Sequence, residues 1–292
     1  MTYSSTSLKQ NSKSRSRNSV GKMVFTSRSL NQMLLLIQWD LTKIVRRVIF
    51  VVMRATWFAV QVTLFGIALS YMISTRNVGL DPQQYYKFYL LGIYTSILFS
   101  ITASRAYDIA EEFEEGIIEY QLSLPINRKV LAIGRAIGGG IASTIFTLPM
   151  FFTVVVLANE FSLTSILLSL SASLLFSVGI AGMVISITLS IKSGDATDIL
   201  MGALDAILVR LSTIFYPSIV LRNIAPYYYA ALVNPVSHLA DLLRIFYSFE
   251  DFKFFVITNP LAMACYIIGL AVGVSVMTMH IIESKLEGGG WR

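Results

Sequence analysis

The chain has 292 residues, of which 55% are hydrophobic and only 14% are charged, with a net charge of +6 and a mean hydropathy of +0.66. A soluble domain of average composition carries about 25% charged residues, so the composition excludes an ordinary soluble fold and predicts an all-α polytopic membrane protein. The single cysteine, Cys265, excludes a disulfide bond within the chain.

Residues 1–28 contain six cations, no acidic residue and many serines. This composition predicts a basic, disordered cytoplasmic tail. An Arg- and Ser-rich targeting presequence is the alternative, and Met23 is a second candidate start of the chain.

Residues 29–47 form the next unit, in which apolar residues recur at intervals of three and four: Leu30, Met33, Leu34, Ile37, Leu41, Ile44 and Val45. This spacing predicts an amphipathic helix. Trp39 and the cationic pair Arg46 and Arg47 favour a position along the inner membrane surface. The alternative is a simple extension of the first membrane span.

Residues 48–292 are expected to form one transmembrane domain. Its long apolar segments predict six membrane-spanning helices, near residues 56–74, 88–107, 130–157, 163–191, 199–221 and 259–282. Small residues recur at helix-packing spacing in Gly134 and Gly138, in Gly269 and Gly273, and in a serine ladder from Ser165 to Ser177. We expect these faces to pack against other helices.

The loop between spans 2 and 3, residues 108–129, is unusually acidic. Residues 111–128 alone hold five of the 17 acidic residues of the chain: Glu111, Glu112, Glu114, Glu115 and Glu119. The pattern predicts a short amphipathic helix that ends at Pro125 and precedes the basic pair Arg128 and Lys129. A docking site for another protein explains such a loop better than a solvated acidic face does.

Span 5 contains the ionisable residues that are most costly to place in a membrane. Asp205 and Arg210 lie within it, and Ser212 follows on the stripe of Asp205. A cation at the centre of a membrane helix costs about 3 kcal/mol or more, so such residues normally face a bundle interior or an aqueous path. We expect Asp205, Arg210 and Ser212, with Thr95 of span 2, to line a translocation pathway; purely structural pairing is the alternative.

The segment between spans 5 and 6, residues 222–258, is semi-apolar, aromatic and interrupted by Pro226 and Pro235. It is too short to cross the membrane twice, so it predicts a re-entrant or interfacial helical pair on the outer side. Residues expected to form a gate there are Pro217, Asn234, Pro235, His238, Asp241 and Arg244.

The distribution of basic residues orients the chain. Seventeen Lys and Arg residues flank the spans on one side and five on the other, with Arg210 inside span 5. Because Lys and Arg favour the cytoplasmic side, both termini and the acidic loop are predicted to be cytoplasmic. This asymmetry also accounts for the net charge of +6 without a nucleic-acid partner.

Motifs of common catalytic sites are absent from the sequence. It contains no phosphate-binding loop of the GxxxxGK[ST] type, no HExxH motif and no GxSxG elbow. The two histidines, His238 and His280, are predicted on opposite sides of the membrane, so no metal site is expected. Asp108 and Asp195 loosely resemble the aspartate pair of intramembrane aspartyl proteases, but Lys192 replaces the first glycine of the GxGD motif.

Two motifs carry a family resemblance over residues 29–285. The first lies in the acidic loop and consists of Glu114, Gly116, Ile118, Glu119, Leu122, Leu124, Pro125, Ile126 and Arg128. The second follows span 5 and consists of Phe215, Tyr216, Pro217, Asn234, Pro235, His238, Asp241, Leu243 and Arg244. Together they resemble the membrane (permease) subunits of ABC-2-type ABC exporters. The chain departs from that family's pattern at Ile117 and at Tyr120-Gln121.

The resemblance implies a plasma-membrane export subunit that is not itself an enzyme. Two such subunits, identical or different, would form the pathway, and two separate ATPase subunits would bind ATP and Mg²⁺. The ATPase would dock on the loop residues Glu112, Glu114, Glu115, Gly116, Ile118, Glu119, Leu122, Pro125 and Arg128. The alternatives are an aspartyl-type membrane protease and a non-transporting regulatory subunit, and the sequence does not distinguish a glycan, lipid, drug, peptide or ion as substrate.

Overall fold

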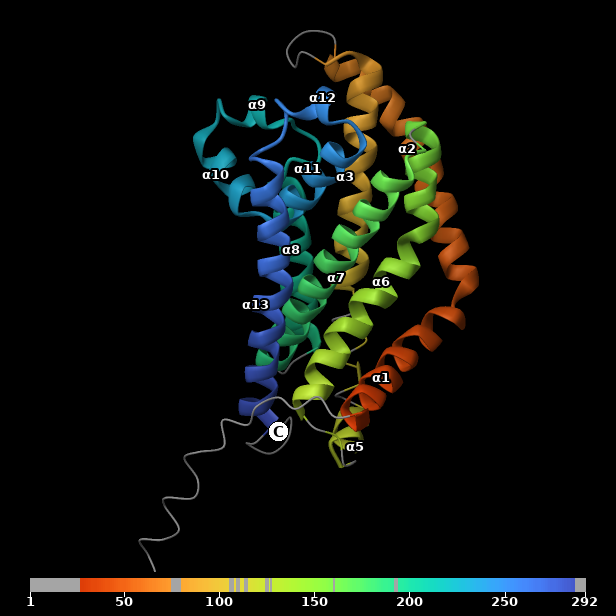
Figure 1. Cartoon of the computed structure of the whole chain (residues 1–292), viewed down its shortest axis with the longest axis vertical. Helices are drawn as coiled ribbons and strands as arrows, with labels where there is room; N and C mark the ends of the chain where they lie inside the picture. The colour runs from red at the N-terminus through yellow and green to blue at the C-terminus, as the bar shows by residue number, and fades with distance from the viewer. Residues whose placement is uncertain are drawn as a thin grey trace, which may run out of the picture.

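A computed structural model describes residues 27–74, 80–104, 108, 111–112, 115–123, 126, 128–159, 161–191 and 194–286. Every regular element in these ranges is a helix, and the long helices run side by side as a bundle (Figure 1). The predicted tail, residues 1–28, lies almost wholly outside the described residues. The all-α class that the composition predicted is confirmed for this part of the chain.

Four helices of the described residues are long and apolar enough to cross a membrane. They are α2 (Val48–Ser74), α6 (Arg128–Ala158), α7 (Leu163–Ile191) and α13 (Pro260–Leu286). These helices correspond to the predicted spans 1, 3, 4 and 6. The protein is therefore a membrane protein with four helices of spanning length and composition.

Helices α3 (Pro82–Ala103) and α8 (Gly194–Arg210) run beside these four (Figure 1). With 22 residues, α3 is about 33 Å long, and its four tyrosines and Lys87 make it less apolar than the others. With 17 residues, α8 is about 26 Å long. The prediction of one continuous span over residues 199–221 is wrong, because the helix ends at Arg210 and residues 211–217 are not helical.

The two ends of the bundle carry different short elements (Figure 1). One end, called here the α5 end, has α5 (Ile117–Ser123), the start of α1 (Ser27–Val45) and the end of α13. The opposite end has four short helices, called here the cap: α9 (Ser218–Leu221), α10 (Ala225–Val233), α11 (Pro235–Tyr247) and α12 (Phe249–Phe252).

Helix α1 packs closely along the first half of α6. Gly134 and Gly138 of α6 make room for it, because a Cβ atom at these positions would lie 2.7 Å from Leu36 Cδ1 and 2.6 Å from Asp40 Oδ2, respectively. Small residues spaced four apart let two helices approach in this way. By contrast, an added Cβ at Gly269 or Gly273 would meet nothing within 4 Å, so that expected packing face is uncovered in this chain.

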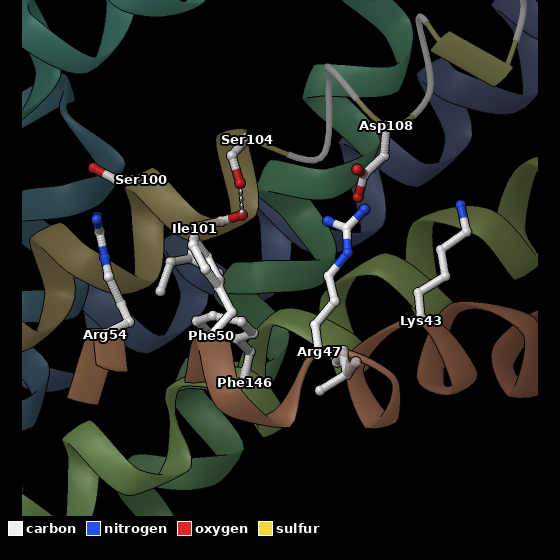
Figure 2. A pocket seen from close by; sticks show the side chains of 10 residues that line it. Lys43, Arg47, Phe50, Arg54, Ser100, Ile101, Ser104, Asp108 and Phe146 are labelled. Carbon is white, nitrogen blue, oxygen red and sulfur yellow. Dashed lines mark hydrogen bonds between the residues drawn. The ribbon is translucent and has the colours of Figure 1, made fainter. Parts of the chain in front are cut away.

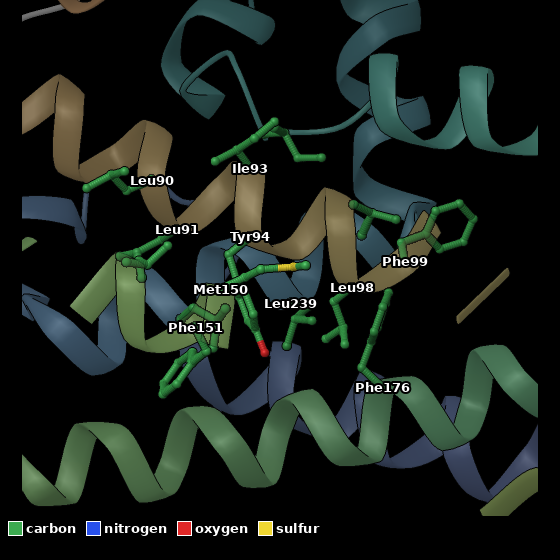
Figure 3. Packing of buried hydrophobic residues seen from close by; sticks show 14 of the residues in the cluster. Leu90, Leu91, Ile93, Tyr94, Leu98, Phe99, Met150, Phe151, Phe176 and Leu239 are labelled. Carbon is green, nitrogen blue, oxygen red and sulfur yellow. The ribbon is translucent and has the colours of Figure 1, made fainter. Parts of the chain in front are cut away.

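The apolar core lies between α3, α6, α7 and α11 (Figure 3). Tyr94 of α3 is fully buried, and its ring lies 5.2 Å from that of Phe151 of α6. Its hydroxyl donates to Ser173 of α7 at 3.5 Å, which joins the third helix. The amphipathic helix α11 buries its apolar face here through Leu239, so the cap is rooted in the bundle core.

Candidate functional site

The acidic loop is exposed at two of its carboxylates and buried at a third. Glu111 and Glu115 are exposed, and Gly116 follows with a φ of +72°, a left-handed conformation that favours glycine. This turn leads directly into α5. Tyr120 on α5 is 66% exposed, so the turn and this helix present an open surface at the α5 end.

Glu112 does not belong to that open surface. It is only 4% exposed and forms ion pairs with Lys43 of α1 and Arg135 of α6. Arg135 Nη1 also donates to Asp40 Oδ1 at 3.0 Å, and both residues are buried. This Arg135 cluster (Asp40, Lys43, Glu112 and Arg135) ties the acidic loop to α1 and α6. Glu112 is therefore held within the chain in this conformation, and its contact with a partner stays a prediction.

The structure describes the surroundings of only two of the other predicted docking residues, Gly116 and Arg128. Gly116 is half-buried and Arg128 is exposed at the first turn of α6. Ile118, Glu119 and Leu122 lie on α5, and their side chains lie outside what the structure describes, as do residues Glu114 and Pro125.

The predicted pathway residues do not share one surface. Asp205 is half-exposed on α8 and accepts a hydrogen bond from Ser100 of α3 at 2.5 Å, and Arg210 is exposed. Thr95 and Ser212 are fully buried. The Thr95 hydroxyl donates to Leu91 O, and that of Ser212 donates to Val209 O. In this conformation, Thr95 and Ser212 lie in the protein interior, and their place in a pathway stays a prediction.

Arg244 of α11 is the centre of a second buried polar group, which the cap and α3 build together. Its guanidinium donates to Asp241 Oδ1 at 2.5 Å, to Phe88 O at 3.0 Å and to Ile214 O at 2.9 Å. It also lies 3.3 Å from the centre of the Phe88 ring. Burial lowers the pKa of Arg244 to about 10. This value is still well above neutral pH, so the guanidinium stays charged.

Asp241 completes this Arg244 cluster (Thr213, Ser237, Asp241 and Arg244). Its carboxylate accepts hydrogen bonds from Thr213 Oγ1 at 2.9 Å and from the backbone N–H of Ile257 at 2.8 Å. Both charges are fully buried and hydrogen-bonded, as buried ion pairs must be to persist. The cluster therefore holds the cap on the bundle, with both charges inside the protein; the gate role of Asp241 and Arg244 stays a prediction.

The remaining predicted gate residues also act within the chain. Asn234 caps α11 by accepting from the Val236 N–H, and its amide donates to Leu208 O and Leu211 O at the end of α8. Pro235 follows as the first residue of α11, and the buried Pro217 precedes α9. The sequence motif thus marks residues that fold the cap.

His238 links the cap to α13. Its Nε2 lies 2.8 Å from Leu232 O, and its ring stacks on Tyr266 at 4.0 Å. Burial lowers the pKa of His238, so the imidazole is neutral at neutral pH. Because Leu232 O can only accept, Nε2 carries the proton of the neutral ring and donates it. The neutral ring contributes no charge to an ion pathway.

The two aspartates of the protease hypothesis have different surroundings. Asp108 lines a cavity with Arg47 and Ser104 (Figure 2), whereas Asp195 is exposed in the first turn of α8. Among the described residues, no group of three or more His, Cys, Asp or Glu side chains is arranged to hold a metal ion.

Some residues of these clusters had only weak sequence signals. Asp40 and Lys43 lie among the polar residues of the amphipathic helix, and nothing in their spacing indicates a buried ion pair. Arg135 appeared only as a basic residue at the edge of the acidic loop. Gly92 of α3 had no signal, although an added Cβ there would lie 2.5 Å from Ile214 O.

Comparison with known proteins adds no relative: no protein-family model matches the chain, and no curated protein is significantly similar to it.

Proposed function

We propose that the chain is the membrane subunit of an ATP-driven exporter of the ABC-2 type. Two such subunits form the translocation pathway, and two separate ATPase subunits bind ATP and Mg²⁺ at the α5 end. The chain itself carries no catalytic residues in this scheme. It resides in the plasma membrane with both termini in the cytoplasm.

The construction of the acidic loop is the observation that carries this proposal. Glu111, Glu115 and Tyr120 offer charge and apolar area to a partner. Directly behind them, the buried Arg135 cluster fixes the loop to α1 and α6. A force applied to the exposed surface is thereby transmitted to membrane helices, which an ATP-driven subunit requires and a solvated loop does not.

Six spans give the best account of the topology. Helices α3 and α8 cross the membrane beside the four apolar helices, which makes six spans. Helix α1 lies along the inner surface, and the cap enters the outer leaflet without crossing it. Arg210 and the half-exposed Asp205 on α8 are costly in contact with lipid. A second subunit or an aqueous path against α8 removes that cost, which supports a pathway between two copies or between two related subunits.

Gentle purification from the native membrane tests the docking role. The wild-type chain should recover an ATPase with a phosphate-binding loop in equal amount. The double variant Glu111→Lys/Glu115→Lys should reduce that recovery by more than ~10-fold, because several charge-assisted contacts of about 1.5–3 kcal/mol each become repulsions. Glu250→Lys, an exposed carboxylate of the cap, is the matched control and should recover the ATPase normally.

Recovery of the stable chain without any ATPase would overturn the exporter proposal. Equal recovery with the double variant and with Glu250→Lys would overturn the docking role of the acidic turn alone.

A further inference from the structure

A basic cleft lies where α1 meets α2, against the end of α3. It is a cavity of about 230 Å³ whose polar lining consists of Lys43, Arg47, Arg54, Ser100, Ser104 and Asp108. Figure 2 shows these side chains around the cavity, with Arg47 pointing toward Asp108 and Arg54 lying beside Ser100. Phe50 and Phe146, whose ring centres are 6.3 Å apart, form the apolar wall.

The charge of this lining favours an anion. It holds three cations against one carboxylate, and Lys43 already pairs with Glu112. Arg47 and Arg54 are both exposed. Arg47 directly precedes α2 and Arg54 lies seven residues further, about two helical turns, so both project from the same side of α2, about 10 Å apart along its axis. Guanidinium groups are suited to phosphate because they donate two parallel hydrogen bonds.

The depth of the cleft matches the boundary between membrane and water. The candidate span begins at Val48, so Arg47 lies at its edge and Arg54 lies within its second turn. Phe50 and Trp57 on the same side of α2 are 59% and 66% exposed, and such aromatic residues favour the headgroup level. A lipid headgroup placed here neutralises Arg54, and its acyl chains lie along the exposed apolar face of α2.

A neighbouring hollow provides a contrast. Its volume is about 300 Å³, and its lining contains the cations Lys43, Arg46 and Arg47 and the carboxylates of Asp108, Glu111, Glu112 and Glu115. With three cations and four carboxylates, that lining is net negative and does not favour an anion. Arg46 borders only this hollow and not the basic cleft.

We propose that the basic cleft is a binding site for the phosphate group of an anionic membrane lipid, with Arg47 and Arg54 as its ligands. The cavity is smaller than the roughly 300–1,000 Å³ of sites that enclose a drug-sized molecule, so it accepts the headgroup while the rest of the lipid stays in the bilayer. This binding is independent of whether the chain transports anything.

Lipid retention by the full-length chain tests the site. The protein is reconstituted in phosphatidylcholine nanodiscs that contain phosphatidylglycerol, extracted in a neutral detergent, and its retained lipids are identified by native mass spectrometry. Arg47→Gln/Arg54→Gln should lower phosphatidylglycerol retention relative to phosphatidylcholine by about tenfold or more, since each charge-assisted bond lost corresponds to at least that factor. Arg46→Gln removes one positive charge from the neighbouring hollow, outside the basic cleft, and should change phosphatidylglycerol retention by less than ~2-fold.

A second variant fills the cleft without changing its charge. Ser104→Phe, at the exposed end of α3, should lower phosphatidylglycerol retention as strongly as the arginine variant. Unfolding temperatures in phosphatidylcholine alone confirm that each variant is folded. Equal retention by Arg46→Gln, Ser104→Phe and the double arginine variant would overturn the proposal.

The source of the phosphate is distinguished by competition. Glycerol 3-phosphate at constant ionic strength should leave the retained phosphatidylglycerol in place if the site takes a membrane lipid. Displacement by the soluble ester would support a phosphate site and overturn its assignment to lipid.

Discussion

Gly92 lies at the most crowded point of the Arg244 cluster. A Cβ atom there would lie 2.5 Å from Ile214 O and 2.6 Å from Arg244 Nη2. The backbone oxygen cannot move aside as a flexible side chain does, so any side chain at this position separates α3 from residues 211–217. The absence of a side chain at residue 92 is thus what allows Arg244 to bond Phe88 O and Ile214 O together.

Gly92→Ala should therefore destabilise the protein by about 1–3 kcal/mol, the usual cost of overpacking, and lower its unfolding temperature in detergent. Gly269→Ala in α13 is the matched control, because its Cβ meets nothing within 4 Å. It should change stability by less than ~1 kcal/mol. Equal unfolding temperatures for the two variants would contradict the crowding at Gly92.

At the residue scale, the sequence identifies which polar residues share a helix but not which atoms they bind. His238, Asp241 and Arg244 follow one another at helical spacing, and they do lie on one helix. Their partners Phe88, Ile214 and Ile257 are far away in the sequence and contribute backbone atoms. Backbone atoms carry no residue-type signal, so the sequence motif does not reveal which segments these side chains bind.

The link between α1 and α6 is the corresponding feature at the scale of elements. Two glycines bring the helices together, and the Arg135 cluster closes the contact with three carboxylate–cation pairs. Removing the central cation leaves Asp40 and Glu112 buried with fewer partners, which costs about 3–5 kcal/mol when a buried pair is broken.

Arg135→Gln should loosen α1 from the bundle. The expected result is at least ~10-fold faster tryptic cleavage after Lys43, Arg46 and Arg47, because cleavage follows local opening. Arg128→Gln, an exposed arginine on the same helix, should leave the cleavage rate unchanged. Unchanged cleavage in Arg135→Gln would show that the glycine contact alone holds α1.

Element-level prediction succeeded where composition decides and failed where tertiary contacts decide. The apolar runs of α2, α6, α7 and α13 are long enough to identify from hydropathy. The end of α8 at Arg210 was missed because Leu211–Tyr216 is apolar enough to continue a helix. There, the Asn234 amide binds Leu211 O and Ser237 Oγ accepts from the Thr213 N–H, and these contacts replace helical hydrogen bonds.

At the scale of the whole molecule, the two ends of the bundle must lie on opposite sides of the membrane if six helices cross it. The exposed residues Glu115 at the α5 end and Glu250 in the cap provide one position at each end. Cys265→Ser removes the native thiol, which is exposed, and gives a background for labelling.

In that background, a membrane-impermeant maleimide should label Glu250→Cys in intact cells and label Glu115→Cys only after permeabilisation. The expected orientation follows from the excess of basic residues on the α5 side. Labelling of both variants in intact cells would contradict the proposed topology.

Helix α2 has few buried side chains for a helix of its length. Only Phe58, Val62 and Ser70 on it are buried among the side chains described, so most of its surface is left to lipid or to another subunit. In a bilayer, the hydrophobic effect inserts a helix but does not attach it to its neighbours. Insertion and assembly are therefore separate steps for α2: the bilayer fixes its depth, while few protein contacts fix its tilt. Such a helix can change its angle without disrupting the core, and the headgroup bound at Arg47 and Arg54 would act as its pivot.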